Sequence, residues 1–138
     1  MALLLGGCFN PGDCVKNNKS NIELAFVNAS GAAQTVQFSS IAISGLKQPI
    51  LTNVNANAVS LPVNPAAANT TFIFVRSNRK DSITFTYRNQ ALVLNPDCGA
   101  IIYHRDLDFS VNTFGANTLQ ITNRQLLTTV SRNATLRF

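Results

Sequence analysis

One histidine and two aspartates in the second half of the sequence have the residue types and spacing of a small ligand site. His104, Asp106 and Asp108 occupy alternate positions, and alternate residues of a strand lie on one face about 6.6 Å apart. An imidazole and two carboxylates on one face can hold a hard cation, exchange protons or contact a glycan. The same pattern also fits an ordinary solvent-facing side of a strand whose other side, with Leu107 and Phe109, lies in the core.

Other constellations that carry chemistry are missing from the sequence. A hydrolase triad needs a base beside a nucleophile, but His104 is the single histidine and no nucleophile-elbow glycine pattern accompanies it. Asp106 and Asp108 are the only close pair among the six acids, and the Gly6-Gly7 pair does not form a phosphate-binding loop. We therefore expect no enzymatic activity, no catalytic residues, no cofactor and no metal centre.

The elements that would position these residues are strands. Residues 71–75 and 82–87 flank a polar turn at 76–81, and together they form the surest hairpin in the sequence. Apolar and polar residues alternate along 82–87, which is typical of a half-buried strand. The continuous apolar run at 72–75 predicts a strand that is covered on both faces or lies deep in a sandwich.

Further apolar alternations predict a single all-β domain. They lie near residues 21–28, 34–46, 59–61, 90–94, 100–111, 118–122 and 131–138. Seven or eight short strands with turn signals about every dozen residues indicate an antiparallel β-sandwich, immunoglobulin-like or related.

Composition and charge exclude several classes of protein. The chain is 46% hydrophobic and 12% charged, which is unlike a disordered, highly charged protein. The net charge of +5 comes from eleven basic residues spread along the whole chain against six acids. Because the basic residues do not cluster as they do in a nucleic-acid interface, we expect no nucleic-acid partner.

The amino-terminal residues resemble the lipobox of bacterial lipoproteins. Leu5, Gly6, Gly7 and Cys8 match its positions, and the resemblance implies that Cys8 is acylated after the preceding segment is removed. Residues 1–7 contain no Lys or Arg and are shorter than a full secretory signal. Either they are the remnant of a longer signal peptide, or the match is a coincidence.

The lipobox also accounts for the odd number of cysteines. If Cys8 takes the lipid, Cys14 and Cys98 remain to form a disulfide, which would close a loop of about 84 residues and stabilise the fold by about 4 to 5 kcal/mol. The alternative is three reduced cysteines in a cytosolic domain.

Several segments, in the same order, resemble a family of small Bacteroidota outer-membrane lipoproteins without an assigned function. They are Cys8 with Cys14, the strand at 81–87, the Cys98-Gly99 pair and the segments 121–123 and 136–138. The resemblance implies an exported, acyl-anchored β-domain and carries no activity with it.

The resemblance also bears on location and modification. Surface display in that phylum is thought to use acidic residues after the acylated cysteine, and here only Asp13 follows Cys8 closely. The periplasmic face of the outer membrane is therefore favoured over the cell surface. Asp81-Ser82-Ile83 is similar to the sites at which such proteins are glycosylated, which makes Ser82 a candidate.

These inferences give an organisation and two hypotheses. We expect a signal-peptide remnant at 1–7, a lipid-anchored tether at 8–20 and a β-sandwich at 21–138. The first hypothesis is a non-enzymatic accessory or interaction subunit of an outer-membrane protein or complex, held in the membrane lipid through Cys8. The second is a glycan- or cation-binding module that uses the face with His104, Asp106 and Asp108.

Overall fold

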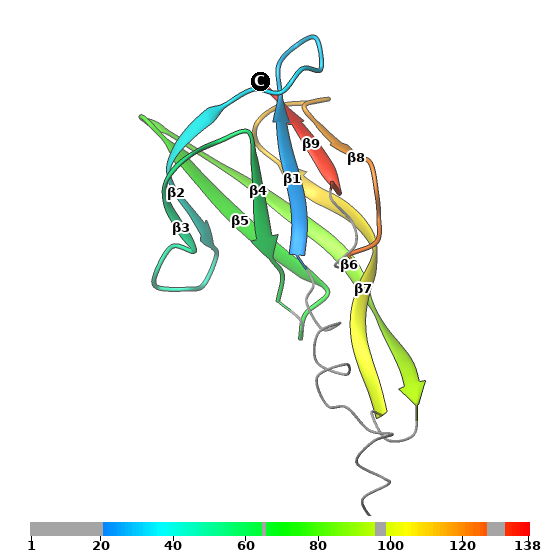
Figure 1. Ribbon diagram of the computed structural model, residues 1–138. Coiled ribbons are helices and arrows are strands. Elements are labelled where there is room, and N and C mark those ends of the chain that lie inside the picture. Colours follow the sequence, from blue (N-terminus) through cyan, green and yellow to red (C-terminus); the bar gives the residue numbers. More distant parts are fainter. Residues whose placement is uncertain (1–20, 65, 96–98, 127–131) are drawn as a thin grey trace, which may run out of the picture.

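Nine strands form two sheets that face each other across a shared core (Figure 1). The computed structural model describes residues 21–64, 66–95, 99–126 and 132–138, and of residues 90–95 and 99–103 it describes the backbone alone. The strands are β1 (Asn21–Val27), β2 (Val36–Ile43), β3 (Leu51–Ala56), β4 (Ala58–Pro62), β5 (Asn69–Arg76), β6 (Arg79–Asn95), β7 (Gly99–Asn112), β8 (Leu119–Ile121) and β9 (Ala134–Arg137).

The topology confirms an all-β sandwich. One sheet has the order β4-β1-β9-β8, and the other has the order β3-β2-β5-β6-β7. Neighbouring strands are antiparallel except β1 and β9, which pair in parallel. A parallel pair needs a long crossover, and here the crossover consists of strands β2 to β8.

The core is built largely from phenylalanine. Five phenylalanines are fully buried, namely Phe26, Phe38, Phe72, Phe74 and Phe85. The ring of Phe38 lies 5.4 Å from that of Phe26 in the first sheet and 5.5 Å from that of Phe74 in its own sheet. These ring contacts join the two sheets, since aromatic pairs at such distances contribute beyond the area they bury.

The predicted hairpin is present as β5 and β6. Ile83, Phe85 and Tyr87 share the core face, as the alternation predicts. Of the two alternatives for residues 72–75, a position deep in the sandwich is confirmed, because Phe72 and Phe74 are fully buried. Cover on both faces is wrong, because Ile73 and Val75 are only partly buried. One face of this sheet carries the core, and the other face lies at the surface.

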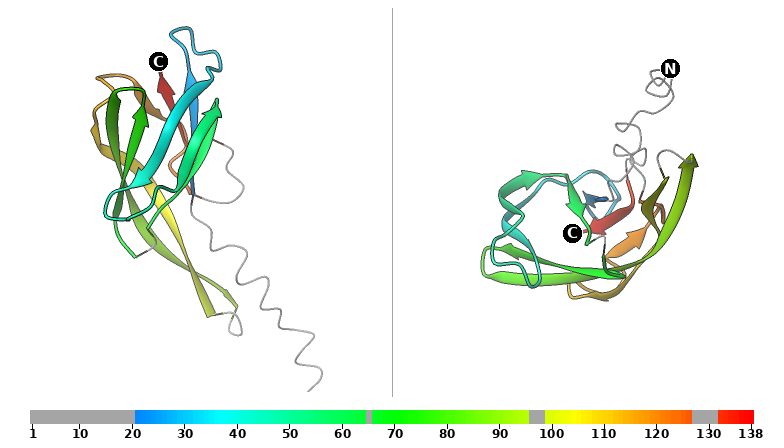
Figure 2. Two further views of the ribbon diagram at one scale, coloured as in Figure 1. Left: turned by 90° about the vertical axis from the view of Figure 1, so that its left-hand side faces the viewer. Right: turned by 90° about the horizontal axis from the view of Figure 1, so that it is seen from below.

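The longest strands, β6 with 17 residues and β7 with 14, leave the sandwich together. The pairing of β5 with β6 stops at Thr86, whereas the pairing of β6 with β7 continues to Asn95 and Gly99. Residues 88–95 and 99–105 therefore form a two-stranded projection, the β6–β7 arm (Figures 1 and 2). It projects beyond the end of the sandwich at which β1 begins (Figure 1). In the described residues, no helix is long and apolar enough to cross a bilayer.

Candidate functional site

A β-bulge at the root of the arm determines which face of β7 each of the predicted ligand residues occupies. Between the partners of Thr86 and Arg88, β7 places two residues, Asp106 and Leu107, opposite the single residue Tyr87 of β6. Asp106 has a φ of 57°, a left-handed conformation that aspartate tolerates better than most residues. An extra residue in one strand reverses the alternation of side chains beyond it.

The bulge separates His104 from the two aspartates. His104 is 1% exposed, with its ring 5.0 Å from that of Tyr87 in an edge-to-face contact. The side chains of Asp106 and Asp108 are 42% and 58% exposed. The prediction that all three residues share one solvent face is therefore wrong, because the extra residue turns His104 toward the core. Within the described part of the chain, no three His, Cys, Asp or Glu residues lie close enough to hold a metal ion.

A second irregularity lies farther along β7. The register also shifts between Thr84 and Phe85, so that Ser110 is the extra residue on β7. Phe109 packs against the core, but Val111, which its parity would place beside it, is 44% exposed.

Instead of a ligand face, the root of the arm carries interleaved charges. Asp106 lies 3.5 Å from the Arg88 guanidinium and 3.6 Å from that of Arg105. Asp108 lies 3.6 Å from Arg124, whose guanidinium also donates to the Leu107 carbonyl at 2.7 Å. Arg88, Arg105 and Arg124 thus pair with the two aspartates where the arm leaves the sandwich, and we call these three residues the arginine collar. Exposed pairs of this kind contribute little to stability.

Tyr87, next to Arg88 in β6, is buried and takes part in a polar network inside the sandwich. The Tyr87 hydroxyl donates to the Asn64 carbonyl at 2.9 Å and lies 2.6 Å from the Thr70 hydroxyl. Burial raises the pKa of Tyr87 above its usual 10.0, although these two hydrogen bonds partly oppose the change. A shallow pocket of about 320 Å³ adjoins this network. Its lining residues are all uncharged: Ile43, Ser44, Asn64, Ala67, Asn69, Thr70 and Thr71.

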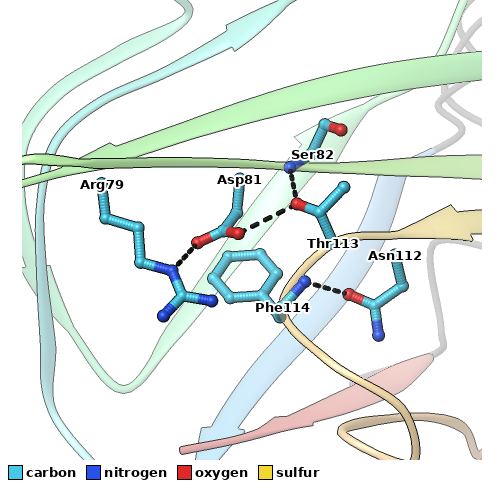
Figure 3. Close-up of polar contacts among 6 residues, drawn as sticks. All are labelled: Arg79, Asp81, Ser82, Asn112, Thr113 and Phe114. Carbon is cyan, nitrogen blue, oxygen red and sulfur yellow. Dashed lines mark hydrogen bonds and ion pairs between the residues drawn. The ribbon is translucent and has the colours of Figure 1, made fainter.

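A second polar cluster surrounds the proposed glycosylation site. The Asp81 carboxylate is 5% exposed and accepts from the Arg79 guanidinium at 2.6 Å and from the Thr113 hydroxyl at 2.9 Å (Figure 3). Thr113 in turn accepts from the Ser82 amide at 2.8 Å and donates its own amide to the Ser82 carbonyl at 3.0 Å. Asn112 next to it caps the amide of Phe114 at 3.0 Å. Ser82 is only partly buried and its hydroxyl points away from the cluster (Figure 3), so glycosylation there stays a prediction.

The hydrogen-bonded clusters of Tyr87 and Asp81 therefore maintain the fold. Comparison with known proteins finds one family, and its function is unknown. Residues 35–137 match the family model DUF6452, described as a family of unknown function. The chain belongs to DUF6452. No curated protein and no solved structure matches it.

Membership of DUF6452 confirms the expectation of an uncharacterised family. The lipid anchor, the outer-membrane location and the bacterial phylum stay predictions.

The DUF6452 match begins at Thr35, so β1 precedes it, although β1 lies between β4 and β9 in its sheet. Cys8, Cys14 and Cys98 fall outside the described residues, and so do the predicted remnant at 1–7 and the tether at 8–20.

The arginine collar is the part of this DUF6452 chain that sequence reasoning missed. Arg88 and Arg105 are partners in the register of β6 and β7, and Arg124, in the segment after β8, pairs with Asp108 of β7. No spacing in the sequence signals this meeting, because it depends on the position of the bulge. Arg88 lies nine residues after Arg79 in the sequence, but both are in β6, which runs from the hairpin turn at Arg79 to the arm, where Arg88 pairs with Arg105.

Proposed function

We propose that this chain is a non-enzymatic lipoprotein of the cell envelope, anchored in the outer membrane through an acylated Cys8. It serves as an accessory or interaction subunit of an outer-membrane protein or complex, with the periplasmic face favoured. The observation that carries the proposal is the Leu5-Gly6-Gly7-Cys8 sequence ahead of the sandwich.

The geometry of the described residues supports an interaction role. The polar contacts of Asp81 and Tyr87 satisfy neighbouring backbone and side-chain groups of the fold. The β6–β7 arm projects from the sandwich, and the arginine collar lies at its root. A protruding ribbon with charges at its base suits contact with another surface. The glycan- or cation-binding alternative has only Asp106 and Asp108 at the surface, and both already face arginines.

We also propose that Cys14 and Cys98 form a disulfide, because they are the two cysteines that remain when Cys8 carries the lipid.

Mass spectrometry of protein from its own host tests the anchor and the disulfide together. We expect a chain that begins at an acylated Cys8 and a tryptic peptide pair linked through Cys14 and Cys98. A native protein with Met1 and an unmodified Cys8 would refute the lipoprotein proposal. A Cys8→Ala variant is the control, and we expect it to leave the membrane fraction.

Purification in mild detergent tests the accessory role. Chemical crosslinking before solubilisation should retain an outer-membrane protein in fixed proportion to this chain. Repeated recovery of the acylated chain alone, with and without crosslinker, would contradict an accessory role while leaving the anchor intact.

A further inference from the structure

Two arginines face each other at the turn between β5 and β6. Arg76 ends β5 and Arg79 begins β6, and the register pairs them directly. Phe74 and Asp81, which lie two residues farther along each strand, are buried. Because alternate residues of a strand share a face, both arginines lie on the core side of the sheet, at its edge. Like charges directly opposite each other destabilise a strand pair, so this arrangement requires a counter-charge.

Arg79 has a counter-charge, whereas Arg76 has none. The Arg79 Nε atom donates to the Asp81 carboxylate at 2.6 Å, and the other oxygen of that carboxylate accepts from Thr113. The two terminal nitrogens of Arg79 lie on the side of its guanidinium away from Asp81 (Figure 3). Within the described residues, the Arg76 side chain has no ion pair and no hydrogen bond, and its Nε atom is buried without an acceptor. The two guanidinium groups thus have one carboxylate between them, and one positive charge is uncompensated.

The other acids of the described chain do not supply the missing charge. Asp106 and Asp108 pair with arginines at the root of the arm, toward the other end of β6. Glu23 of β1 accepts a hydrogen bond from Ser60 of β4, in the other sheet. A charged donor that has lost its water without gaining an acceptor is unfavourable, so Arg76 is suited to a ligand.

Two aromatic rings hold the Arg76 guanidinium in place. Its central carbon lies 4.8 Å from the centre of the Phe138 ring and 5.9 Å from that of the Phe114 ring. These two rings lie 5.8 Å apart, and the Phe114 ring lies 5.4 Å from that of Phe74 in the core. A guanidinium that lies over a ring keeps its N–H groups for an acceptor in its own plane. Packing therefore fixes Arg76, and the described residues leave its donors unused.

The chemistry of this pair fits a carboxylate. A guanidinium binds planar carboxylates and phosphates through parallel N–H groups. A carboxylate carries one negative charge, which balances the one uncompensated positive charge beside Asp81. A phosphate group carries about 1.5 to 2 negative charges at pH 7 and would exceed it. The neighbouring phenylalanine rings lower the local dielectric constant and strengthen such a pair.

The position of the pair suits contact with a protein. The Phe138 amide donates to the carbonyl of Val27, the last residue of β1, at 2.8 Å, so Arg76 lies at the end of the sandwich where β1 ends. The proposed anchor at Cys8 precedes the start of β1, which lies at the other end (Figure 1). The two arginines are therefore at the end of the sandwich remote from the point at which the chain from the anchor enters.

We propose that Arg76 and Arg79 form a docking site for an aspartate or glutamate side chain of a protein partner. The carboxylate site rests on the contacts of the two arginines. Its assignment to a protein rests on the proposed function.

NMR titration tests the carboxylate site by itself. The full chain carries Cys8→Ser so that no lipid is attached, and the probe is N-acetyl-aspartate amide at constant ionic strength. We expect it to move the Nε–H signals of Arg76 and Arg79 to a saturating value. N-acetyl-asparagine amide, which has the same shape without the charge, should leave both signals unchanged. Inorganic phosphate is the third probe, and tighter binding of phosphate than of the aspartate probe would overturn the assignment to a carboxylate.

Variants of Arg76 test whether its guanidinium makes the site. Arg76→Gln keeps much of the stem that packs on the rings, and we expect it to bind the aspartate probe at least about tenfold more weakly, measured at the Arg79 signal. Arg137→Gln is the matched control, because Arg137 is exposed and its loss changes the net charge equally, so it should bind as the parent does. Matching urea unfolding curves would show that the sandwich is intact. Should Arg76→Gln not fold, the two amide probes on the parent chain decide alone.

Crosslinking in the native host tests the protein partner. With Cys8 intact, the Arg76→Gln chain should stay in the membrane fraction but lose the crosslinked outer-membrane protein, whereas Arg137→Gln should retain it.

Two results would overturn the docking site. One is an aspartate probe that shifts no signal of the parent chain, and the other is an Arg76→Gln chain that binds the probe or crosslinks as the parent does. A parent chain that binds the probe but never crosslinks to a protein would refute the accessory role, and with it the protein partner, while the carboxylate site would stand.

Discussion

Asn133 and Glu23 are joined by two hydrogen bonds although 110 residues separate them. The Glu23 amide donates to Asn133 Oδ1 at 2.8 Å, and the Asn133 amide donates to the Glu23 carbonyl at 2.8 Å. The side-chain Nδ2 of Asn133 also donates to the carbonyls of Asn123 and Gln125, at 3.0 and 2.8 Å. This fully buried amide thus ties β1 to the segments after β8 and before β9.

Asn133→Ala should be among the most destabilising single substitutions. It leaves one buried amide and two carbonyls without their partner, so we expect a loss of about 3 kcal/mol or more in the free energy of unfolding. Asn133→Asp keeps the acceptor for Glu23 but cannot donate when ionised, so it should also destabilise. Urea unfolding measures both. Asn21→Ala is the control, because its hydrogen bond to Ser60 is exposed, and it should cost under about 0.5 kcal/mol.

Thr113→Val tests the cluster around Asp81. The substitution keeps the shape of the side chain but removes the donor to Asp81 and the acceptor for the Ser82 amide. We expect a loss of about 1 to 3 kcal/mol, measured by urea unfolding. Thr113→Ser keeps the hydroxyl and should lose much less. Equal stabilities of the Val and Ser variants would show that these hydrogen bonds do not matter.

Tyr87 should make stability fall at alkaline pH. Because burial raises the pKa of folded Tyr87 above 10.0, the unfolded chain releases this proton first as the pH rises. The contribution is fully present below pH about 10 and is lost as the pH rises through the folded pKa. Tyrosinate absorbance of the folded protein should show one delayed titration that Tyr87→Phe abolishes. A wild-type titration with no group delayed beyond pH 10 would contradict it.

The bulge at Asp106 should accept asparagine but not a β-branched residue. Asparagine tolerates a positive φ and removes the charge, whereas valine at the same φ costs about 1 to 2 kcal/mol. The exposed ion pair with Arg88 contributes little, so we expect Asp106→Asn to be nearly neutral and Asp106→Val to be destabilised. Thermal and urea unfolding of the two variants measure the difference. A loss as large for Asn as for Val would assign the role of Asp106 to its charge instead.

The sequence predicted the kind of fold well because its strands alternate clearly. The alternation at Ile83, Phe85 and Tyr87 depends only on the two-residue period of a strand, and the structure reproduces it. The positions of His104 and Val111 depend on bulges in a pairing between distant residues, and nothing in their own segment reports those bulges. The parallel pairing of β1 with β9 was unpredictable for the same reason.

The candidate site shows the same difference between what local patterns predict and what long-range register determines. Residue types could suggest that His104, Asp106 and Asp108 act together, but one extra residue in β7 was enough to turn the histidine inward. The arginine collar is produced by the same bulge and by the segment that carries Arg124. Local patterns therefore found the elements, whereas long-range register determined which side chains meet.

The parallel pair of β1 and β9 has a consequence for how this protein is made. β1 leaves the ribosome among the first strands, and its neighbour β9 is synthesised about 110 residues later. Until then the first sheet lacks a strand at its centre, and contacts between such distant segments form slowly. The first sheet therefore cannot be completed until the last residues of the chain have been made, so its closure is a late step of folding.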